Sequence, residues 1–228
     1  MLNIGMVLFP QLTQLDLTGP HEVLARLPDA RVYLVAASLD PVRSDRGLTI
    51  SPDATFDSTP ALDILCVPGG AGVDPLMEDE RVLEFLRARA EHARYVTSVC
   101  TGALLLGAAG LLDGYRATTH WLSLDLLPLF GALPVAERVV VDRNRITGGG
   151  VTAGIDFALA MAAELFGAEL AQEIQLTLEY DPAPPWPGGS PRSSPPGVVH
   201  TVTNSRSAHR AARRALAERA AARLRAWR

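Results

Sequence analysis

The chain of 228 residues is long enough for one full hydrophobic core, and 48% of its residues are hydrophobic, so we expect most of it to fold as one domain. All 21 basic residues are arginines, and 25 acidic residues outnumber them, so the net charge of -4 gives no general signal for nucleic-acid binding. The start of the chain lacks the pattern of a signal peptide, and no apolar run approaches the roughly 20 residues of a membrane helix. Two cysteines in separate apolar runs favour free thiols and a cytoplasmic location over a disulfide framework.

Short apolar runs, typical of strands, alternate along the chain with longer helical runs. Strands and helices are predicted in turn for residues 4–9, 20–27, 32–37, 64–67, 75–89, 95–99 and 102–112. A hairpin is expected between residues 41 and 53, a second one between 138 and 147, and a long helix over 151–166. This alternation indicates an α/β fold, a single-domain three-layer α/β/α sandwich with a mainly parallel central sheet, over residues 1–191.

The last part of the chain, residues 192–228, is predicted to be a linker and an arginine-rich C-terminal helix. Proline and glycine dominate residues 181–197, which is typical of a surface loop. From His200 onward the chain carries eight arginines against one acid, Glu218, with the spacing of one amphipathic helix. We expect this helix to be solvated or packed in a dimer, and the alternatives are contact with phosphate or nucleic acid and disorder.

Cys100 directly follows the strand predicted at 95–99 and precedes a turn of small residues, Thr101 and Gly102, that opens a helix. This pattern is typical of a nucleophile elbow. The positive end of the helix and free backbone amides would favour the thiolate, so we expect Cys100 to be nucleophilic at neutral pH. The alternative is a buried cysteine that serves as a small hydrophobic residue, which is our interpretation of Cys66 in mid-strand.

Two further loops should lie at the same edge of the sheet as Cys100, because they also follow predicted strands. In the glycine-rich turn after residue 67, the amides of Gly70 and Ala71 could stabilise negative charge on a substrate, although a simple tight turn is the alternative. In the first loop Asp16 stands between two leucines. Desolvation would favour its protonated form and suit a proton donor, whereas the alternative is a helix N-cap.

Only one histidine, His120, follows a strand at a point where it could face this site, and a structural role for it is the alternative. The sequence has no His-x-x-x-His, Cys-x-x-Cys or acidic cluster with metal-ligand spacing. We therefore expect neither a metal nor an organic cofactor.

These motifs resemble the ThiJ/PfpI superfamily, which has the flavodoxin-like fold of class I glutamine amidotransferases. The resemblance is carried by residues 14–20, 67–70, 95–102, 117–121, 147–150 and 178–185. Many members carry a glutamate in the first loop and a histidine after the cysteine, where this chain has Asp16 and Thr101. Both departures point to the isonitrile hydratase branch of the superfamily, and this likeness covers residues 4–191.

The resemblance implies a homodimer that hydrates isonitriles to N-substituted formamides without a cofactor. Cys100 would attack the isonitrile carbon, Asp16 would donate a proton as general acid, and a thioimidate would form before water releases the formamide. The hydroxyl of Thr101 would hold the substrate nitrogen or the water. The expected partners are thus a small isonitrile, water and a second copy of the chain, with no nucleic acid and no membrane.

Three other interpretations remain open at the level of sequence. A transcriptional regulator is disfavoured, because the roughly 30 residues after the linker are too few for a paired helix-turn-helix domain. A ligand sensor or redox sensor built on the same cysteine, without DNA binding, is the second. A glyoxalase-like or deglycase-like enzyme of the same superfamily is the third.

Overall fold

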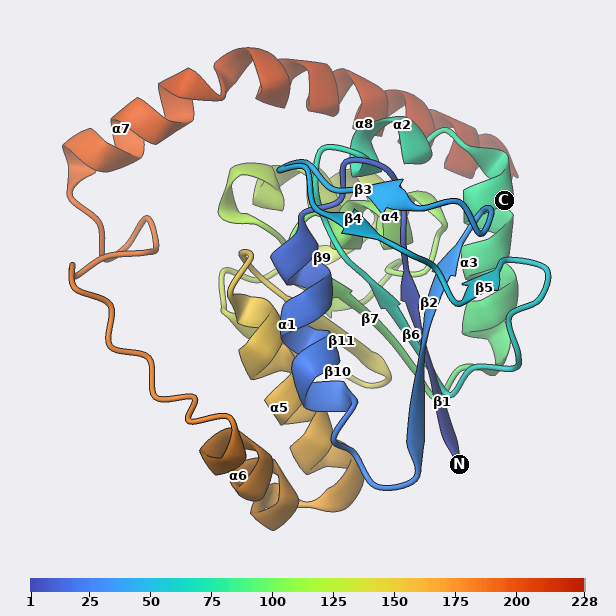
Figure 1. The fold of residues 1–228 in the computed structure, drawn as a ribbon. Coiled ribbons are helices and arrows are strands. Elements are labelled where there is room, and N and C mark those ends of the chain that lie inside the picture. Colours follow the sequence, from blue (N-terminus) through green and yellow to red (C-terminus); the bar gives the residue numbers. More distant parts are fainter. Residues whose placement is uncertain (228) are drawn as a thin grey trace.

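A seven-stranded sheet forms the centre of the computed structural model, which describes residues 1–227 (Figure 1). Its strand order is β10-β11-β7-β6-β1-β2-β5. The strands are β1 (Leu2–Val7), β2 (Ala30–Ala36), β5 (Ala54–Thr55), β6 (Ile64–Val67), β7 (Tyr95–Val99), β10 (Val139–Asp142) and β11 (Arg145–Gly148). All neighbours are parallel except β10 and β11, which form an antiparallel hairpin at one edge. The predicted, mainly parallel α/β sheet is therefore confirmed.

Helices cover both faces of this sheet. The chain crosses from β1 to β2 and from β6 to β7 in opposite directions along the sheet, and right-handed crossovers then place their helices on opposite faces. Helix α1 (Gln14–Leu24) packs with α5 (Ala153–Phe166) on one face, while α3 (Glu80–His92) and α4 (Gly102–Ala108) contact β6 on the other. This arrangement confirms the three-layer sandwich.

Shorter elements connect these layers. They are α2 (Val73–Leu76), α6 (Ala168–Thr177), the 3-10 helix η1 (Trp121–Phe130), the parallel pair β8 (Arg116–Ala117) and β9 (Leu133–Pro134), and the antiparallel pair β3 (Val42–Arg43) and β4 (Thr49–Ile50). The last pair confirms the hairpin predicted between residues 41 and 53.

Two predicted helices have different bounds in the structure. Helix α1 begins at Gln14, six residues before the predicted start, so Pro20 lies inside the helix and one backbone hydrogen bond is lost there. The helix predicted over 75–89 is broken, because the carboxylate of Asp79 accepts a hydrogen bond from the backbone N–H of Val82 and caps a new helix, α3.

The C-terminal part forms two helices, not the one predicted: α7 (Pro196–Ser205) and α8 (Ser207–Trp227), with a break at Arg206. Helix α8 packs against α2, α4 and η1 of the same chain, and it buries Ala217 and Leu224 in the common core. The expectation of a purely solvated or dimer-packing helix is therefore wrong for this face of α8. By contrast, the segment between α6 and α7 runs outside the body of the molecule, and α7 has no buried residue (Figure 1).

Within residues 1–227, none of the helices combines the length and apolar character that crossing a bilayer requires.

Candidate active site

Cys100 occupies a sharp turn between strand β7 and helix α4. All five residues of β7 are buried, which fixes the end of the strand in the core. Cys100 has φ 54°, in the left-handed region, where a non-glycine residue costs about 1–3 kcal/mol. The turn is held on both sides: the N–H of Cys100 donates to the carbonyl of Gly148 (3.0 Å), and the hydroxyl of Thr119 donates to the carbonyl of Cys100 (2.7 Å). The predicted elbow is thus present.

The three loops predicted to form the site do meet, and Gly69 is their junction. The N–H of Gly69 donates to Oδ2 of Asp16 (2.9 Å). A Cβ at position 69 would lie 2.7 Å from that oxygen and 2.6 Å from the backbone nitrogen of Thr101. Only glycine fits between these groups, because real Cβ atoms do not approach other heavy atoms so closely.

Asp16 lies in the first turn of α1 and is fully buried, so it is not a helix N-cap residue, a position held by Thr13. Among the described residues, Oδ1 of Asp16 has no hydrogen-bond partner. Burial raises the pKa of Asp16 from 3.8 to about 7, although the Gly69 N–H and the Cys100 thiol oppose the rise. This carboxyl group therefore exchanges a proton close to neutral pH.

Cys100 is 5% exposed, and the pKa of its thiol lies well above the usual value. Burial is the main cause, and the negative charge of Asp16 adds to it; the backbone N–H of Thr101 and the charge of Arg213 act in the opposite direction. The expectation that the helix end favours the thiolate is therefore wrong for the protein without substrate. Desolvation outweighs the amides of this short helix.

The hydroxyl of Thr101 ties the elbow to the glycine-rich turn. It accepts a hydrogen bond from the N–H of Gly70 (3.0 Å) and donates to the carbonyl of Gly70 (3.3 Å). The N–H of Gly70 is therefore occupied, which does not fit its predicted role in binding a negatively charged substrate atom. Ala71 is exposed, and its role there stays a prediction.

His120 is at the N-cap position of η1, where its Nδ1 accepts a hydrogen bond from the N–H of Leu122 (3.3 Å). Burial is the main reason why its pKa is lowered to about 4, and the charges of Arg213 and Arg206 add to the effect. His120 is therefore neutral at physiological pH. A neutral ring held by its Nδ1 leaves Nε2 as the N–H donor.

The second cysteine, Cys66, is fully buried in β6, and burial raises the pKa of its thiol to about 12. This agrees with its interpretation as an inert core residue. Neither cysteine forms a disulfide. Within residues 1–227 the structure has no group of three or more histidine, cysteine, aspartate or glutamate side chains that could hold a metal ion.

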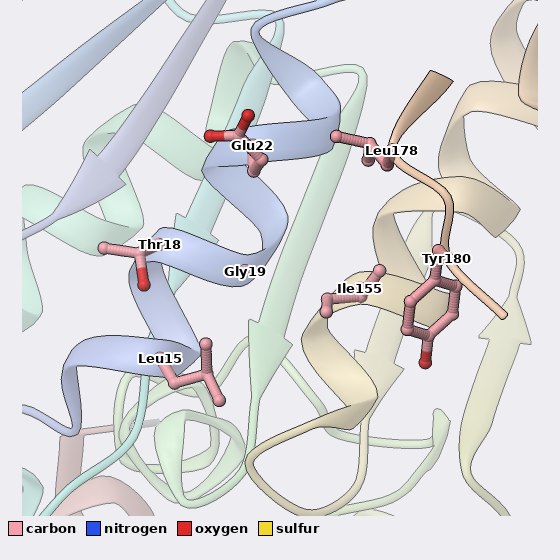
Figure 2. Close-up of a pocket in the computed structure, with 7 residues that line it drawn as sticks. All are labelled: Leu15, Thr18, Gly19, Glu22, Ile155, Leu178 and Tyr180. Carbon is pink, nitrogen blue, oxygen red and sulfur yellow. The ribbon is translucent and has the colours of Figure 1, made fainter. Parts of the chain in front are cut away.

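A pocket of about 350 Å³ opens between α1, α5 and the segment that follows α6 (Figure 2). Figure 2 shows Leu15, Thr18 and Glu22 of α1 across from Ile155 of α5. The remaining lining residues are Gly19, Leu178 and Tyr180. Neither Cys100 nor Asp16 is among the residues that line this pocket.

Sequence reasoning did not single out Gly69, Thr119 or Arg213 as members of the site. The signal for Thr119 was present, because it immediately precedes His120 in a motif that follows a strand. No signal pointed to Arg213, since the sequence does not show which of the eight C-terminal arginines is buried.

Three known proteins are similar to this chain in sequence or structure. An isonitrile hydratase of Pseudomonas putida is 59% identical to this chain over 223 residues, which cover 98% of each protein. The crystal structure of a ThiJ/PfpI family protein from Pseudomonas syringae matches the fold with a TM-score of 0.92 and 48% sequence identity, covering 94% of this chain and 90% of that one. An HTH-type transcriptional regulator of Pseudomonas aeruginosa, GbdR, is 35% identical over 187 residues, which cover 78% of this chain and 51% of the regulator.

The profile of the DJ-1/PfpI family matches residues 3–164, which include all of the seven-stranded sheet except its first residue, and all three loops around Cys100. With this match, the sandwich fold and the cysteine elbow, the chain belongs to the DJ-1/PfpI family.

Proposed function

We propose that this protein is an isonitrile hydratase in which Cys100 is the nucleophile and Asp16 is the general acid. The observation that carries the proposal is the buried pair of Cys100 and Asp16, whose two pKa values are both raised and depend on each other. The 59% identity to an isonitrile hydratase along almost the whole chain supports the choice of substrate. The isonitrile carbon carries no hydrogen and must receive both the sulfur and a proton. A carboxyl group that exchanges its proton in a site with little water suits this addition.

The first step joins the thiol to the terminal carbon of the isonitrile, R–N≡C. The sulfur of Cys100 attacks this carbon, and Asp16 takes up the thiol proton and delivers it to the same carbon, which gives the thioimidate R–N=CH–S–Cys100. The step leaves the net charge of the site unchanged and no isolated thiolate behind. That matters because burial disfavours an isolated thiolate there.

The second step adds water to the thioimidate carbon and then breaks the C–S bond. Water gives R–NH–CH(OH)–S–Cys100, and collapse of this adduct releases the formamide R–NH–CHO and returns the proton to the sulfur. Asp16 serves as the base for water and as the acid for the departing thiol, and a pKa of about 7 suits both tasks. Neither step needs a metal or an organic cofactor.

Three further residues are assigned to substrate contact. The hydroxyl of Thr101 donates only a long hydrogen bond of 3.3 Å to Gly70, so its proton can turn to the substrate nitrogen or to the water. The neutral ring of His120 can offer its Nε2–H to the same nitrogen. The backbone N–H of Ala71, an exposed residue, is the remaining candidate donor from the glycine-rich turn.

We further propose that two copies of the chain form a homodimer, with residues 178–195 reaching the second copy. Trp186 in this segment is 81% exposed, as is Leu176 just before it, so both large apolar side chains are available to pack against a second copy. Light scattering of the wild type should give twice the chain mass, and Trp186→Ser should weaken the dimer. Because the mechanism uses a free thiol, we place the enzyme in a reducing compartment such as the cytoplasm.

The test is formamide production from cyclohexyl isocyanide by the wild type, Cys100→Ala and Asp16→Asn. We expect turnover by the wild type, none by Cys100→Ala, and a loss of about 10²–10⁴-fold for Asp16→Asn, the usual range for a general acid. Full activity of Cys100→Ala would refute the assignment of Cys100 as the nucleophile.

The wild type could fail to hydrate isonitriles while its Cys100 still reacts selectively with a thiol probe. That result would refute isonitriles as the substrate class. Lactate formation from methylglyoxal would then favour the glyoxalase-like enzyme, and oxidation of Cys100 to the sulfinate without turnover of either compound would favour the redox sensor.

A further inference from the structure

Arg213 is the buried arginine of helix α8. It is 7% exposed, whereas Arg214, Arg219 and Arg223 on the same helix are exposed and reach the body from its surface. A guanidinium group is rarely buried unless it is paired and hydrogen-bonded. Arg213 satisfies this requirement with two partners that are far apart in the sequence.

The two partners come from two short helices, α2 and η1, which both contact α4, the helix that follows Cys100. Nε of Arg213 donates to Oδ1 of Asp74 in α2, and Nη1 donates to Oγ of Ser123 in η1 (3.2 Å). Asp74 is 7% exposed and Ser123 is fully buried, so water does not compete for these bonds. Arg213 therefore joins α2 to η1 through the C-terminal helix.

Each partner is in turn hydrogen-bonded to a candidate substrate-binding residue. The N–H of Asp74 donates to the carbonyl of Ala71 (3.2 Å), at the end of the glycine-rich turn. The N–H of Ser123 donates to the carbonyl of His120 (2.8 Å). One side chain thus holds both residues that are hydrogen-bonded to Ala71 and His120.

We propose that Arg213 is a positioning residue of the active site, which fixes the glycine-rich turn and His120 relative to Cys100. The catalytic consequence rests on the isonitrile hydratase function proposed above. The positioning itself does not rest on that function, because Arg213 sets the environment of the Cys100 thiol whether or not a substrate is bound.

The charges around the thiol agree with this role. Asp16 on α1 and Arg213 on α8 are the charged groups that act on Cys100, and they shift the pKa of the thiol in opposite directions. Asp74 balances part of the arginine charge, and His209 lies 3.5 Å from the second oxygen of that carboxylate. Removal of the guanidinium should therefore raise the pKa of the Cys100 thiol further.

The experiment compares Arg213→Met with Arg214→Met. Arg214 is the neighbouring residue on the same helix, but it is exposed and pairs with Asp125 at the surface, so it is a matched control. The rate of Cys100 alkylation by iodoacetamide is followed from pH 6 to 10, together with kcat and KM for cyclohexyl isocyanide. Circular dichroism and thermal melting establish that each variant is folded.

We expect Arg213→Met to move the alkylation profile to higher pH. Alkylation at pH 8 should slow by about threefold to tenfold, since one pKa unit changes the thiolate fraction tenfold. The substitution should also lower kcat more than it raises KM. Arg214→Met should match the wild type within about twofold, in line with the small energies of exposed ion pairs. Arg213→Lys, which keeps the charge, should restore the alkylation profile but only part of kcat, because lysine lacks the two-pronged geometry.

A folded Arg213→Met protein with the alkylation profile and kcat of Arg214→Met would overturn the inference. If Arg213→Met does not fold, Ser123→Ala tests the inference instead, since it removes only the hydrogen bond from Arg213 to η1. A lowered kcat with an unchanged alkylation profile would support the inference, and a wild-type kcat would overturn it. If the wild type hydrates no isonitrile, the proposed function fails, and the alkylation profiles of the folded variants still decide the role of Arg213.

Discussion

Replacing Asp16 with asparagine should stabilise the protein above neutral pH at the same time as it removes the general acid. Folding moves this carboxyl from water into the core and raises its pKa from 3.8 to about 7. Because the native pKa is raised, the native state favours the protonated form. The contribution of Asp16 to stability is therefore greatest below pH 3.8 and is lost as the pH rises through about 7.

The size of this effect follows from the shift. With about 1.4 kcal/mol for each pKa unit, the ionised carboxylate costs the native state about 4 kcal/mol at pH 8 relative to the protonated form. Part of that cost is already present at pH 5, since the unfolded chain is mostly ionised there. Between pH 5 and pH 8 the wild type should therefore lose about 2.5 kcal/mol relative to Asp16→Asn, which has no charge to titrate.

Urea unfolding of both proteins at pH 5 and pH 8 measures this difference. All other groups titrate almost alike in the two proteins, so their effects cancel in the comparison. Asp57→Asn is the matched control, because it makes the same chemical change at a side chain that is 90% exposed. The asparagine oxygen can still accept the hydrogen bond from Gly69, so the loop junction is kept.

A gap between wild type and Asp16→Asn that stays constant within about 0.5 kcal/mol from pH 5 to pH 8 would refute the raised pKa. Asp16 would then be ionised over the whole range, and its assignment as a proton donor near neutral pH would lose its physical basis.

Three further predictions concern the elbow and its surroundings. Cys66→Ala should keep hydration activity within about twofold, and alkylation should still label one thiol, because this side chain only fills the core. Gly69→Ala should lose about 1–3 kcal/mol of stability in thermal melting and most of the hydration activity, since its Cβ would lie 2.6 Å from the nitrogen of Thr101. Normal activity would show that the loops around Gly69 can separate at no cost. Thr119→Val should cost about 1 kcal/mol in urea unfolding and reduce kcat, because the carbonyl of the strained Cys100 turn loses its 2.7 Å hydrogen bond; unchanged kcat would mean that the turn needs no such support.

The sequence was sufficient to predict the sheet and the place of the site. Runs such as residues 64–67 and 95–99 are apolar without alternation, which identifies strands covered on both faces, and the structure places them side by side in the centre. Because parallel strands end at the same edge, loops that follow different strands could be assigned to one site before their distances were known. Asp16, Gly70 and Cys100 were brought together by this argument, and their loops do meet at Gly69.

The state of the chemical groups at that site was decided by tertiary structure alone. Local sequence suggested a thiolate at the helix end, but burial and the charge of Asp16 raise the pKa of Cys100, and both depend on residues distant in the chain. The same holds for the N–H of Gly70, which Thr101 occupies from 31 residues away, and for Arg213, which is 139 residues from Asp74. Sequence periodicity reports which face of an element is apolar, whereas solvation, hydrogen-bond occupancy and charge pairing depend on what the folded chain places opposite that face.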